Sequence, residues 1–366
     1  MKFRLTTRNW ALFALITLAI GLALAGHLPS LGGAEYGLPL MGFGLSTSPF
    51  PVNPTLTAIA IGYKNPEADM IAERVLPEVP VAQKFSYTVY GAAQAFTVPD
   101  TAVGRKSEPN RVEFGGTLVQ DEVLDYGLDD LIPNSDVEAW MAMAKPASGG
   151  PLDPRAISAM LLTHLVQIDR EIRVANKVFA LANYPAANAA TLSGTSQWSD
   201  YTNSNPVSAI MAALDVCLVR PNKMVIGRLA WTKFRQHPKV VESIKASGAG
   251  GVNAQGIVAR QAVADLFELE DVLIGGTMYN TAKPGQIPVY GRAWGKHCSL
   301  IHSAPQSAQL GMPTYGFTAR FGSKVAGDIA DPKAGLRGGV IVRSGESLKE
   351  VISAPDAGYF FQNATA

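Results

Sequence analysis

The sequence has 366 residues, of which 47% are hydrophobic and 17% are charged, and this length suits roughly two or three folded units. Its 31 basic and 30 acidic residues leave a formal net charge of +1, so no overall positive field would hold nucleic acid by neutralising phosphates. Cys217 and Cys298 are the only cysteines. Two cysteines make no disulfide framework and are expected to be reduced, buried thiols, as in a cytoplasmic protein.

The N-terminal segment has the features of a secretory signal. Lys2, Arg4 and Arg8 precede an apolar run, and residues 23–25 offer a small-residue cleavage pattern. The apolar run is also just long enough for a membrane anchor. Both alternatives conflict with the cysteine usage. We therefore interpret residues 1–40 as a leader-like extension that is absent from, or disordered in, the mature subunit.

The next region predicts an arm followed by a hairpin. Prolines between Asn53 and Val81 permit only short helical pieces. Residues 85–89 alternate in polarity, which predicts a strand, and a second strand-like stretch spans residues 111–127. The turn-rich, charged segment 97–110 joins them. The result is a long excursion whose tip is either a solvated loop or an arm that lies on another molecule.

The strongest helix signal begins at Asp153, a good N-cap, followed by Pro154. Helical spacing of apolar residues continues until Tyr184–Pro185, which predicts one helix over residues 153–183, about 45 Å long. We expect Ile168 and Ile172 to face a sheet made partly by the C-terminal strands. The opposite, solvent-facing side would carry Arg155, Gln167, Arg170, Glu171 and Lys177.

The C-terminal half mixes helices and strands without regular alternation. A capped helix starts after Asn205, residues 222–227 form a short buried strand, and residues 228–245 are helical with an interruption at Pro238. A flexible loop over 246–256 precedes a β-rich remainder, whose last segment is expected to fold about Ser344–Gly345. These elements predict the α+β class.

No catalytic or cofactor site emerges. His297, Cys298 and His302 could be metal ligands, but a strand would place them on mixed faces with no carboxylate nearby, which favours a structural role. The glycine-rich stretch 247–256 follows a helix and lacks the Lys-Ser/Thr ending of a phosphate loop. The sequence therefore predicts no enzyme, no cofactor and no metal.

Two groups of charged residues are candidates for contacts between subunits, since charge runs are mostly surface. The excursion tip carries Arg105, Lys106, Glu108, Arg111 and Glu113. An acidic run follows, with Asp121 and Glu122 as further contact candidates ahead of Asp125, Asp129 and Asp130.

The order of the sequence blocks resembles a known family. These blocks are "NPTLTAIAIGY", "GRKSEPNRVEF", the capped long helix, "LVRPNKMVIGRLAWTKFRQHP" and "APDAGYFFQNA". From Asn53 to Ala366 the chain is similar to tailed-bacteriophage major capsid proteins of the Hong Kong 97-like fold. The resemblance implies an N-terminal arm (41–78), an extended E-loop (79–132), a peripheral domain with a long spine helix (133–204 and 315–366) and an axial domain (205–314).

The resemblance also implies a function. Such subunits self-assemble into the hexamers and pentamers of an icosahedral head shell, which forms in the host cytoplasm and encloses double-stranded DNA without sequence-specific binding. A separate scaffolding protein, a portal and possibly a decoration protein would be partners, and the mature form would contact no membrane. Three alternatives stay open: an encapsulin-like nanocompartment shell, an exported periplasmic or surface binding protein if the leader is genuine, and an enzyme whose only candidate site is the group His297, Cys298 and His302.

Overall fold

The computed structural model describes residues 70–90, 97–113, 115–143, 153–246, 256–283, 285–304 and 314–366. The chain divides into two units, residues 1–47 and 48–366, and every described residue belongs to the second. The leader-like extension, most of the predicted N-terminal arm and almost all of the glycine-rich loop lie outside the described residues. None of the helices in the described ranges is both long and apolar enough to cross a bilayer.

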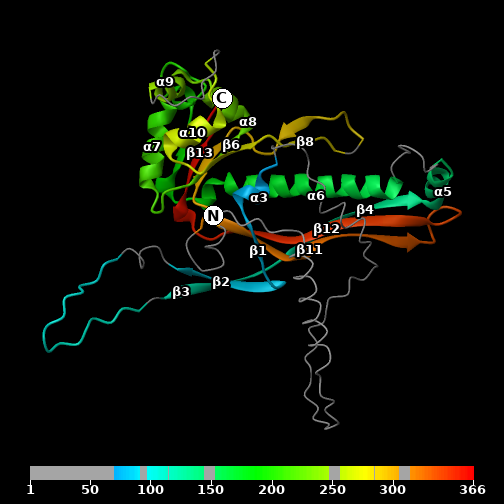
Figure 1. The fold of residues 1–366 in the computed structure, drawn as a ribbon, viewed down its shortest axis with the longest axis horizontal. Coiled ribbons are helices and arrows are strands. Elements are labelled where there is room, and N and C mark those ends of the chain that lie inside the picture. Colours follow the sequence, from blue (N-terminus) through cyan, green and yellow to red (C-terminus); the bar gives the residue numbers. More distant parts are fainter. Residues whose placement is uncertain are drawn as a thin grey trace, which may run out of the picture. The chain divides into compact units, whose positions relative to one another are not determined.

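One sheet has four strands in the order β1-β11-β12-β4. The strands are β1 (Glu78–Pro80), β4 (Leu124–Pro133), β11 (Gly316–Asp331) and β12 (Gly339–Ile352). Only β1 is parallel to its neighbour. The long helix α6 (Pro154–Val178) lies along one face of this sheet, and the short helix α5 (Asn134–Met143) follows β4 at the sheet's end (Figure 1).

The predicted start of α6 is confirmed, because the Asp153 side chain accepts a hydrogen bond from the Arg155 N–H and Pro154 is the first helical residue. Its end comes earlier than predicted, at Val178. Tyr184 donates its hydroxyl to the Val178 carbonyl, and Asn183 donates its amide to the Lys177 carbonyl. These donors satisfy carbonyls that a longer helix would use itself. The helix has 25 residues, about 37 Å.

The buried side of α6 also differs from the prediction. Ile157, Leu161 and Leu165 are 39%, 58% and 50% exposed, and Ile168 and Ile172 are only half-buried. The side chains that α6 does bury include Ala159, Leu162, Thr163, Val166, Arg170, Glu171 and Val174. One side of α6 is apolar and the other is more polar. The more polar side packs on the sheet, because β12 presents polar side chains to α6.

The predicted hairpin is confirmed in its strands, β2 (Lys84–Tyr90) and β3 (Gly116–Glu122), which pair antiparallel. The predicted single strand over residues 111–127 is wrong, because the structure divides it into β3 and β4. The break falls at Val123, which is buried and donates its N–H to the Gln83 carbonyl. Beyond this residue the chain leaves the hairpin and joins the four-stranded sheet.

A second sheet has five strands in the order β5-β13-β10-β6-β7. They are β5 (Ala189–Thr191), β6 (Lys223–Gly227), β7 (Asp271–Gly275), β10 (Cys298–Ile301) and β13 (Gly358–Gln362). The helices around it are α7 (Pro206–Val216), α8 (Arg228–Phe234), α9 (Pro238–Ala246) and α10 (Arg260–Phe267). The predicted cap at Asn205 and the predicted buried strand are confirmed, and Pro238 is the first residue of α9.

The remaining elements are short. They are α3 (Ala72–Val75), the hairpin strands β8 (Met278–Asn280) and β9 (Tyr290–Arg292), and the single 3-10 turns η1 (Leu181–Asn183), η2 (Ala186–Asn188), η3 (Gly194–Ser196) and η4 (Pro355–Ala357).

The largest apolar core belongs to the five-stranded sheet and its helices. It contains Trp198, Phe234 and Phe267. The expectation of reduced, buried thiols is confirmed, because Cys217 and Cys298 are both free and buried. Burial raises the pKa of Cys217 to about 11 and raises that of Cys298 further, so both behave as small apolar residues.

The predicted fold about Ser344–Gly345 is wrong, because β12 runs straight through these residues and the turn from β11 lies at residues 332–338. A Cβ atom on Gly345 would lie 2.7 Å from the Tyr126 carbonyl oxygen and 3.1 Å from Gly127 Cα. The glycine therefore permits a close approach of β4 and does not mark a turn.

Candidate intersubunit contact surfaces

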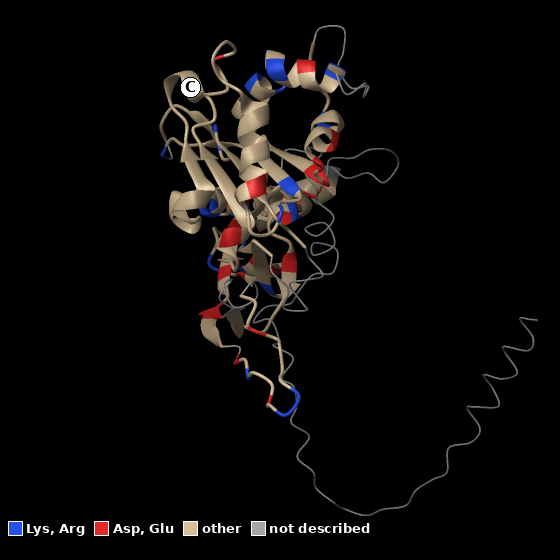
Figure 2. Ribbon diagram, turned by 90° about the vertical axis from the view of Figure 1, so that its left-hand side faces the viewer, with Lys and Arg blue, Asp and Glu red and all other residues tan. Residues whose placement is uncertain are grey.

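The tip of the excursion presents its charges to solvent. Arg105, Lys106, Glu108, Arg111 and Glu113 are all exposed and lie outside regular secondary structure. Figure 2 shows basic and acidic residues gathered at the end of this loop. Arg111 Nη2 and Glu108 Oε2 lie 3.5 Å apart, with side chains 91% and 86% exposed. In a single subunit such an exposed pair contributes roughly 0–1 kcal/mol, so these charges are available to another molecule.

The other two candidate residues lie at the opposite end of the hairpin. Asp121 and Glu122 line a surface hollow of about 540 Å³ together with Lys84, Phe85, Ser86 and Gln120. Asp121 accepts an ion pair from Lys349 Nζ on β12, 3.2 Å away, whereas Glu122 is exposed. The structure thus separates the tip group from the base group, and it engages Asp121 within its own subunit.

The rest of the acidic run joins elements of one subunit. Asp129 accepts two hydrogen bonds of 2.6 Å from Arg343 on β12, and this hydrogen bonding holds the pKa of Asp129 below its ordinary value. Asp130 accepts a hydrogen bond of 2.6 Å from Ser158 on α6. These carboxylates therefore fix β4 to its neighbours.

A layer of partly to fully buried ion pairs lies between α6 and the four-stranded sheet, and sequence reasoning missed it. Glu78 of β1 lies between two arginines, 2.7 Å from Arg170 Nη1 on α6 and 2.5 Å from Arg320 Nη1 on β11. Burial alone would raise the pKa of Glu78, but the two guanidinium groups outweigh burial and lower it. Arg170 had been predicted to face solvent. The position of Arg170 in the helix does not indicate that it is buried, because its partner Glu78 lies 92 residues away in the sequence.

The same layer continues along α6. Arg173 Nε donates to Glu350 Oε1 at 3.0 Å, and the Arg173 guanidinium lies 3.5 Å from the centre of the Tyr126 ring. The Arg173 guanidinium thus makes a cation–π contact with Tyr126 and an ion pair with Glu350 at the same time. We call Glu78, Arg170, Arg173, Arg320, Lys324, Glu346 and Glu350 the charge layer.

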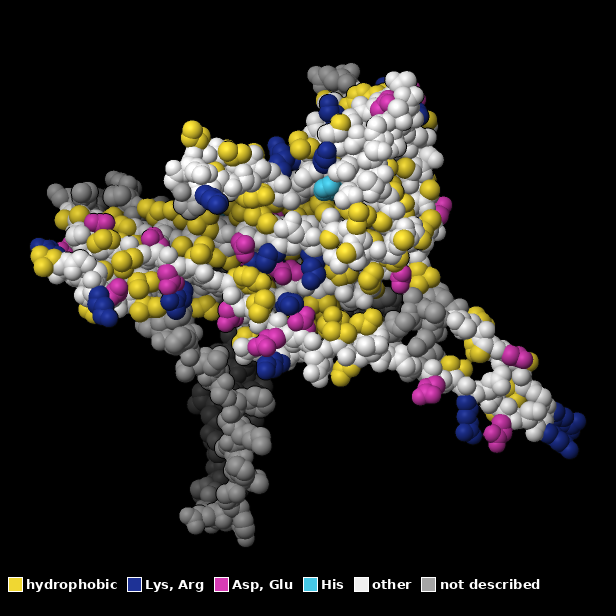
Figure 3. Space-filling view, turned by 180° about the vertical axis from the view of Figure 1, so that it is seen from behind, with side chains coloured by type: hydrophobic (Ala, Val, Ile, Leu, Met, Phe, Trp, Pro, Cys, Tyr) yellow, Lys and Arg dark blue, Asp and Glu magenta, His cyan; other side chains and the backbone are white. Residues whose placement is uncertain are grey.

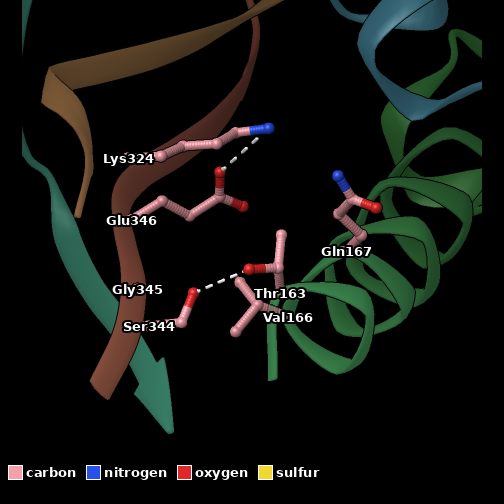
Figure 4. Close-up of a pocket in the computed structure, with 7 residues that line it drawn as sticks. All are labelled: Thr163, Val166, Gln167, Lys324, Ser344, Gly345 and Glu346. Atoms are coloured by element: carbon pink, nitrogen blue, oxygen red, sulfur yellow. Dashed lines mark hydrogen bonds and ion pairs between the residues drawn. The ribbon is translucent and has the colours of Figure 1, made fainter. Parts of the chain in front are cut away.

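Close packing surrounds the layer's next pair. Lys324 Nζ lies 4.0 Å from Glu346 Oε2, and Thr163 Oγ1 on α6 lies 3.0 Å from Ser344 Oγ on β12. Figure 4 shows these side chains lining one cavity with Val166 and Gln167. The cavity has only about 10 Å³, which is at most the space of a single water molecule.

Glu171 joins three parts of the chain at the other end of α6. Its carboxylate accepts hydrogen bonds from the Ala72 N–H at 2.7 Å and from Trp294 Nε1 at 2.6 Å. Burial raises the pKa of Glu171 to about 7, although these donors and Arg170 oppose the shift. The residue had been predicted to face solvent, and the structure instead buries it as the anchor of α3.

The three possible metal ligands have other partners. His297 Nδ1 accepts a hydrogen bond from the Asn363 N–H, and His302 Nδ1 lies 3.0 Å from the Arg220 carbonyl oxygen. Cys298 is buried in the main core. Among the described residues, no three His, Cys, Asp or Glu side chains gather as metal ligands would.

Comparison with known proteins gives close relatives. No family model matches the chain. The chain is 45% identical over 323 residues to the major capsid protein of Pseudomonas phage JBD67, covering 88% of this chain and 100% of the relative. It is 27% identical over 321 residues to the major capsid protein of Burkholderia phage BcepMu, covering 84% of this chain and 95% of that one.

Solved structures agree on the fold. A phage-related protein from Bordetella bronchiseptica RB50 superposes with a TM-score of 0.65 at 20% identity, covering 86% of this chain and 97% of that one. The capsid protein in the shell of cyanophage P-SCSP1u superposes with a TM-score of 0.53 at 12% identity, covering 92% and 98%. The α+β fold with its long helix and excursion is the Hong Kong 97-like fold predicted from the sequence. With 45% identity along the whole of a relative, this chain belongs to the family of phage major capsid proteins.

Proposed function

We propose that this capsid subunit forms the hexamers and pentamers of an icosahedral head shell around double-stranded DNA, and that it has no catalytic role. The observation that carries the proposal is the fully exposed excursion tip on a subunit of this family. A ribbon of two strands is marginally stable in water by itself. Its order would come from lying across a neighbouring subunit, and repeating one such heterologous contact closes rings.

We further propose the domain division that the resemblance implies, with residues 41–78 as N-terminal arm, 79–132 as E-loop, 133–204 with 315–366 as peripheral domain and 205–314 as axial domain. Two strand pairings bear on this division. β4 pairs with β12, so among the described strands the part of the E-loop that pairs only with itself is β2 with β3. β13 pairs with β10, so the five-stranded sheet of the proposed axial domain includes a strand from the C-terminal segment.

We propose Arg105, Lys106, Glu108, Arg111, Glu113 and Glu122 as the contact residues of the excursion. Asp121, the seventh candidate, is already paired with Lys349 in its own subunit and would contact a neighbour only by exchanging that partner. Opposite charges across an interface fix its register and disfavour wrong docking, even where each pair adds little affinity. Because the same contact recurs around a ring, small contributions decide assembly while leaving the stability of one subunit unchanged. Glu122 at the base of the hairpin offers an acidic partner for a basic tip.

The partners in assembly would be copies of this chain, a separate scaffolding protein and a portal, with a decoration protein as a further candidate. The formal net charge of +1 suits a shell that encloses DNA without gripping it, because binding through phosphates requires many unpaired basic residues.

The experiment reverses the charges of the tip. Arg105→Glu with Lys106→Glu should leave a soluble, folded subunit but abolish shells in a sedimentation assay, with partial recovery at high salt because ions screen the new repulsion. Arg105→Lys with Lys106→Arg keeps both charges and serves as the matched control. Normal particle yield from the reversed variant would show that the tip is only a solvated loop.

A further inference from the structure

A second exposed feature is the β8–β9 hairpin. Met278, Ile287, Val289 and Tyr290 are 48%, 86%, 58% and 67% exposed. The two short strands pair only with each other in the described part of the chain. Several large apolar side chains on one projecting hairpin are more than the scattered apolar residues of an ordinary surface, and such groups mark contact sites.

An apolar stripe on α6 is equally exposed. Ile157, Leu161 and Leu165 follow at intervals of four residues, so they lie in one row along the N-terminal half of the helix. Met141 on the adjoining α5 is 57% exposed. In Figure 1 the β8–β9 hairpin and β12 lie on opposite sides of α6, and Figure 3 shows hydrophobic side chains in a band along the molecule below the hairpin. Leu162 and Thr163 of α6 contact β12, so the exposed stripe on the other side of the helix is turned away from that sheet.

The charges beside these two apolar surfaces have opposite signs. Residues 276–297 contain Lys283, Arg292 and Lys296 and no acidic residue. Helix α5 contains Asp136 and Glu138, both exposed, and no basic residue. Glu138 is paired with Arg337 Nη1 at 2.6 Å in its own subunit, so Asp136 is the acid that remains for a partner. Opposite potentials beside matching apolar surfaces favour one docking orientation and oppose others.

We propose that the β8–β9 hairpin of one subunit packs on the α5–α6 apolar stripe of a second copy of this chain. Both surfaces are exposed within one subunit, so neither covers the other there. A second copy supplies both the missing apolar cover and the complementary charge. The contact rests on assembly of the chain into shells and is separate from the contact proposed for the excursion tip. It explains why α6 keeps an apolar row that its own sheet does not use.

Disulfide trapping tests this contact directly. Ile287→Cys and Leu161→Cys are combined in one chain, whose native Cys217 and Cys298 are buried and do not compete. After oxidation of assembled particles, we expect a ladder of crosslinked oligomers on a non-reducing gel, reversed by reductant. Each single variant should stay monomeric on the gel. Ile287→Cys with Leu336→Cys is the matched control, because Leu336 is a fully exposed leucine at the β11–β12 turn.

The outcomes separate this proposal from assembly itself. Particles that form normally but give no ladder would overturn the hairpin contact and leave shell formation intact. A crosslink within single chains would also overturn it. If the double cysteine variant fails to assemble, Ile287→Ser with Tyr290→Ser decides the matter. This variant should unfold at the same urea concentration as the unaltered subunit yet lose at least tenfold in particle yield, and an unchanged yield would refute the contact.

Discussion

The unit around the five-stranded sheet and the contact between α6 and the four-stranded sheet are held by different forces. The first buries a continuous apolar cluster that includes Trp198, Phe234 and Phe267. The second has an apolar cluster around Leu162, whereas the cluster around Val174 joins the end of α6 to strands of the five-stranded sheet. Along α6, the charge layer lies between these two clusters.

The difference concerns specificity more than strength. Apolar burial is non-directional and grows with area. A buried ion pair costs desolvation and adds little net stability, but removing one partner leaves an uncompensated charge. The five-stranded unit is therefore expected to tolerate repacking, whereas the charge layer fixes the position of α6 on its sheet. Three predictions, given in order of decreasing free-energy change, test this contrast.

The largest effect should come from the apolar core. Phe234 is fully buried against Trp198 and Phe267. Phe234→Ala should lower the free energy of unfolding by about 3–5 kcal/mol, measured by urea denaturation of the unassembled subunit. Leu229→Ala on the same helix is the control, since Leu229 is half exposed and its loss should matter little. A loss below about 1 kcal/mol for Phe234→Ala would contradict the contrast.

An intermediate effect should appear in the pH dependence of stability. Burial raises the pKa of Glu171 from its ordinary 4.5 to about 7. Between these two pH values the folded state keeps a proton on Glu171 that the unfolded state has released. The stability that this proton supplies is fully present below pH 4.5 and is lost as the pH rises through 7. The change is on the order of 3 kcal/mol. Glu171→Gln should flatten urea-unfolding stability between pH 5 and 8.

Glu78 provides the control of opposite sign. Its pKa is lowered in the folded state, so its contribution is present above its unfolded pKa and is lost as the pH falls through the folded value. Glu78→Gln should therefore change the acid side of the profile and leave the slope near neutrality in place. If Glu171→Gln kept that slope, Glu171 would not be its source.

The smallest effect should come from the exposed side of α6. Ile168→Ala should cost less than about 2 kcal/mol, because Ile168 is only half-buried. Leu162→Ala, six residues earlier on the buried side, should cost about 2–5 kcal/mol. Thermal unfolding of both variants as unassembled subunits measures the difference. Equal costs would mean that α6 packs on its sheet through the side first predicted from the sequence.

Features that depend on neighbouring residues could be predicted from the amino-acid sequence alone. Asp153 with Pro154, and Asn205 with Pro206, set the starts of α6 and α7 because a cap acts within one turn. The alternation of residues 85–89 determined β2, and the ordered blocks pointed to the family. The charged tip was also identified correctly as an exposed loop.

Long-range contacts set which side of α6 is buried, where the second strand of the excursion breaks, and the place of Gly345 inside a strand. Each depends on a distant partner: Glu78 for Arg170, Gln83 for Val123, and Tyr126 for Gly345. When a helix has two sides that could be buried, it packs through the side whose polarity matches that of the sheet. The polar side chains of β12 and β11 supplied that complement, and no local pattern within α6 could show it.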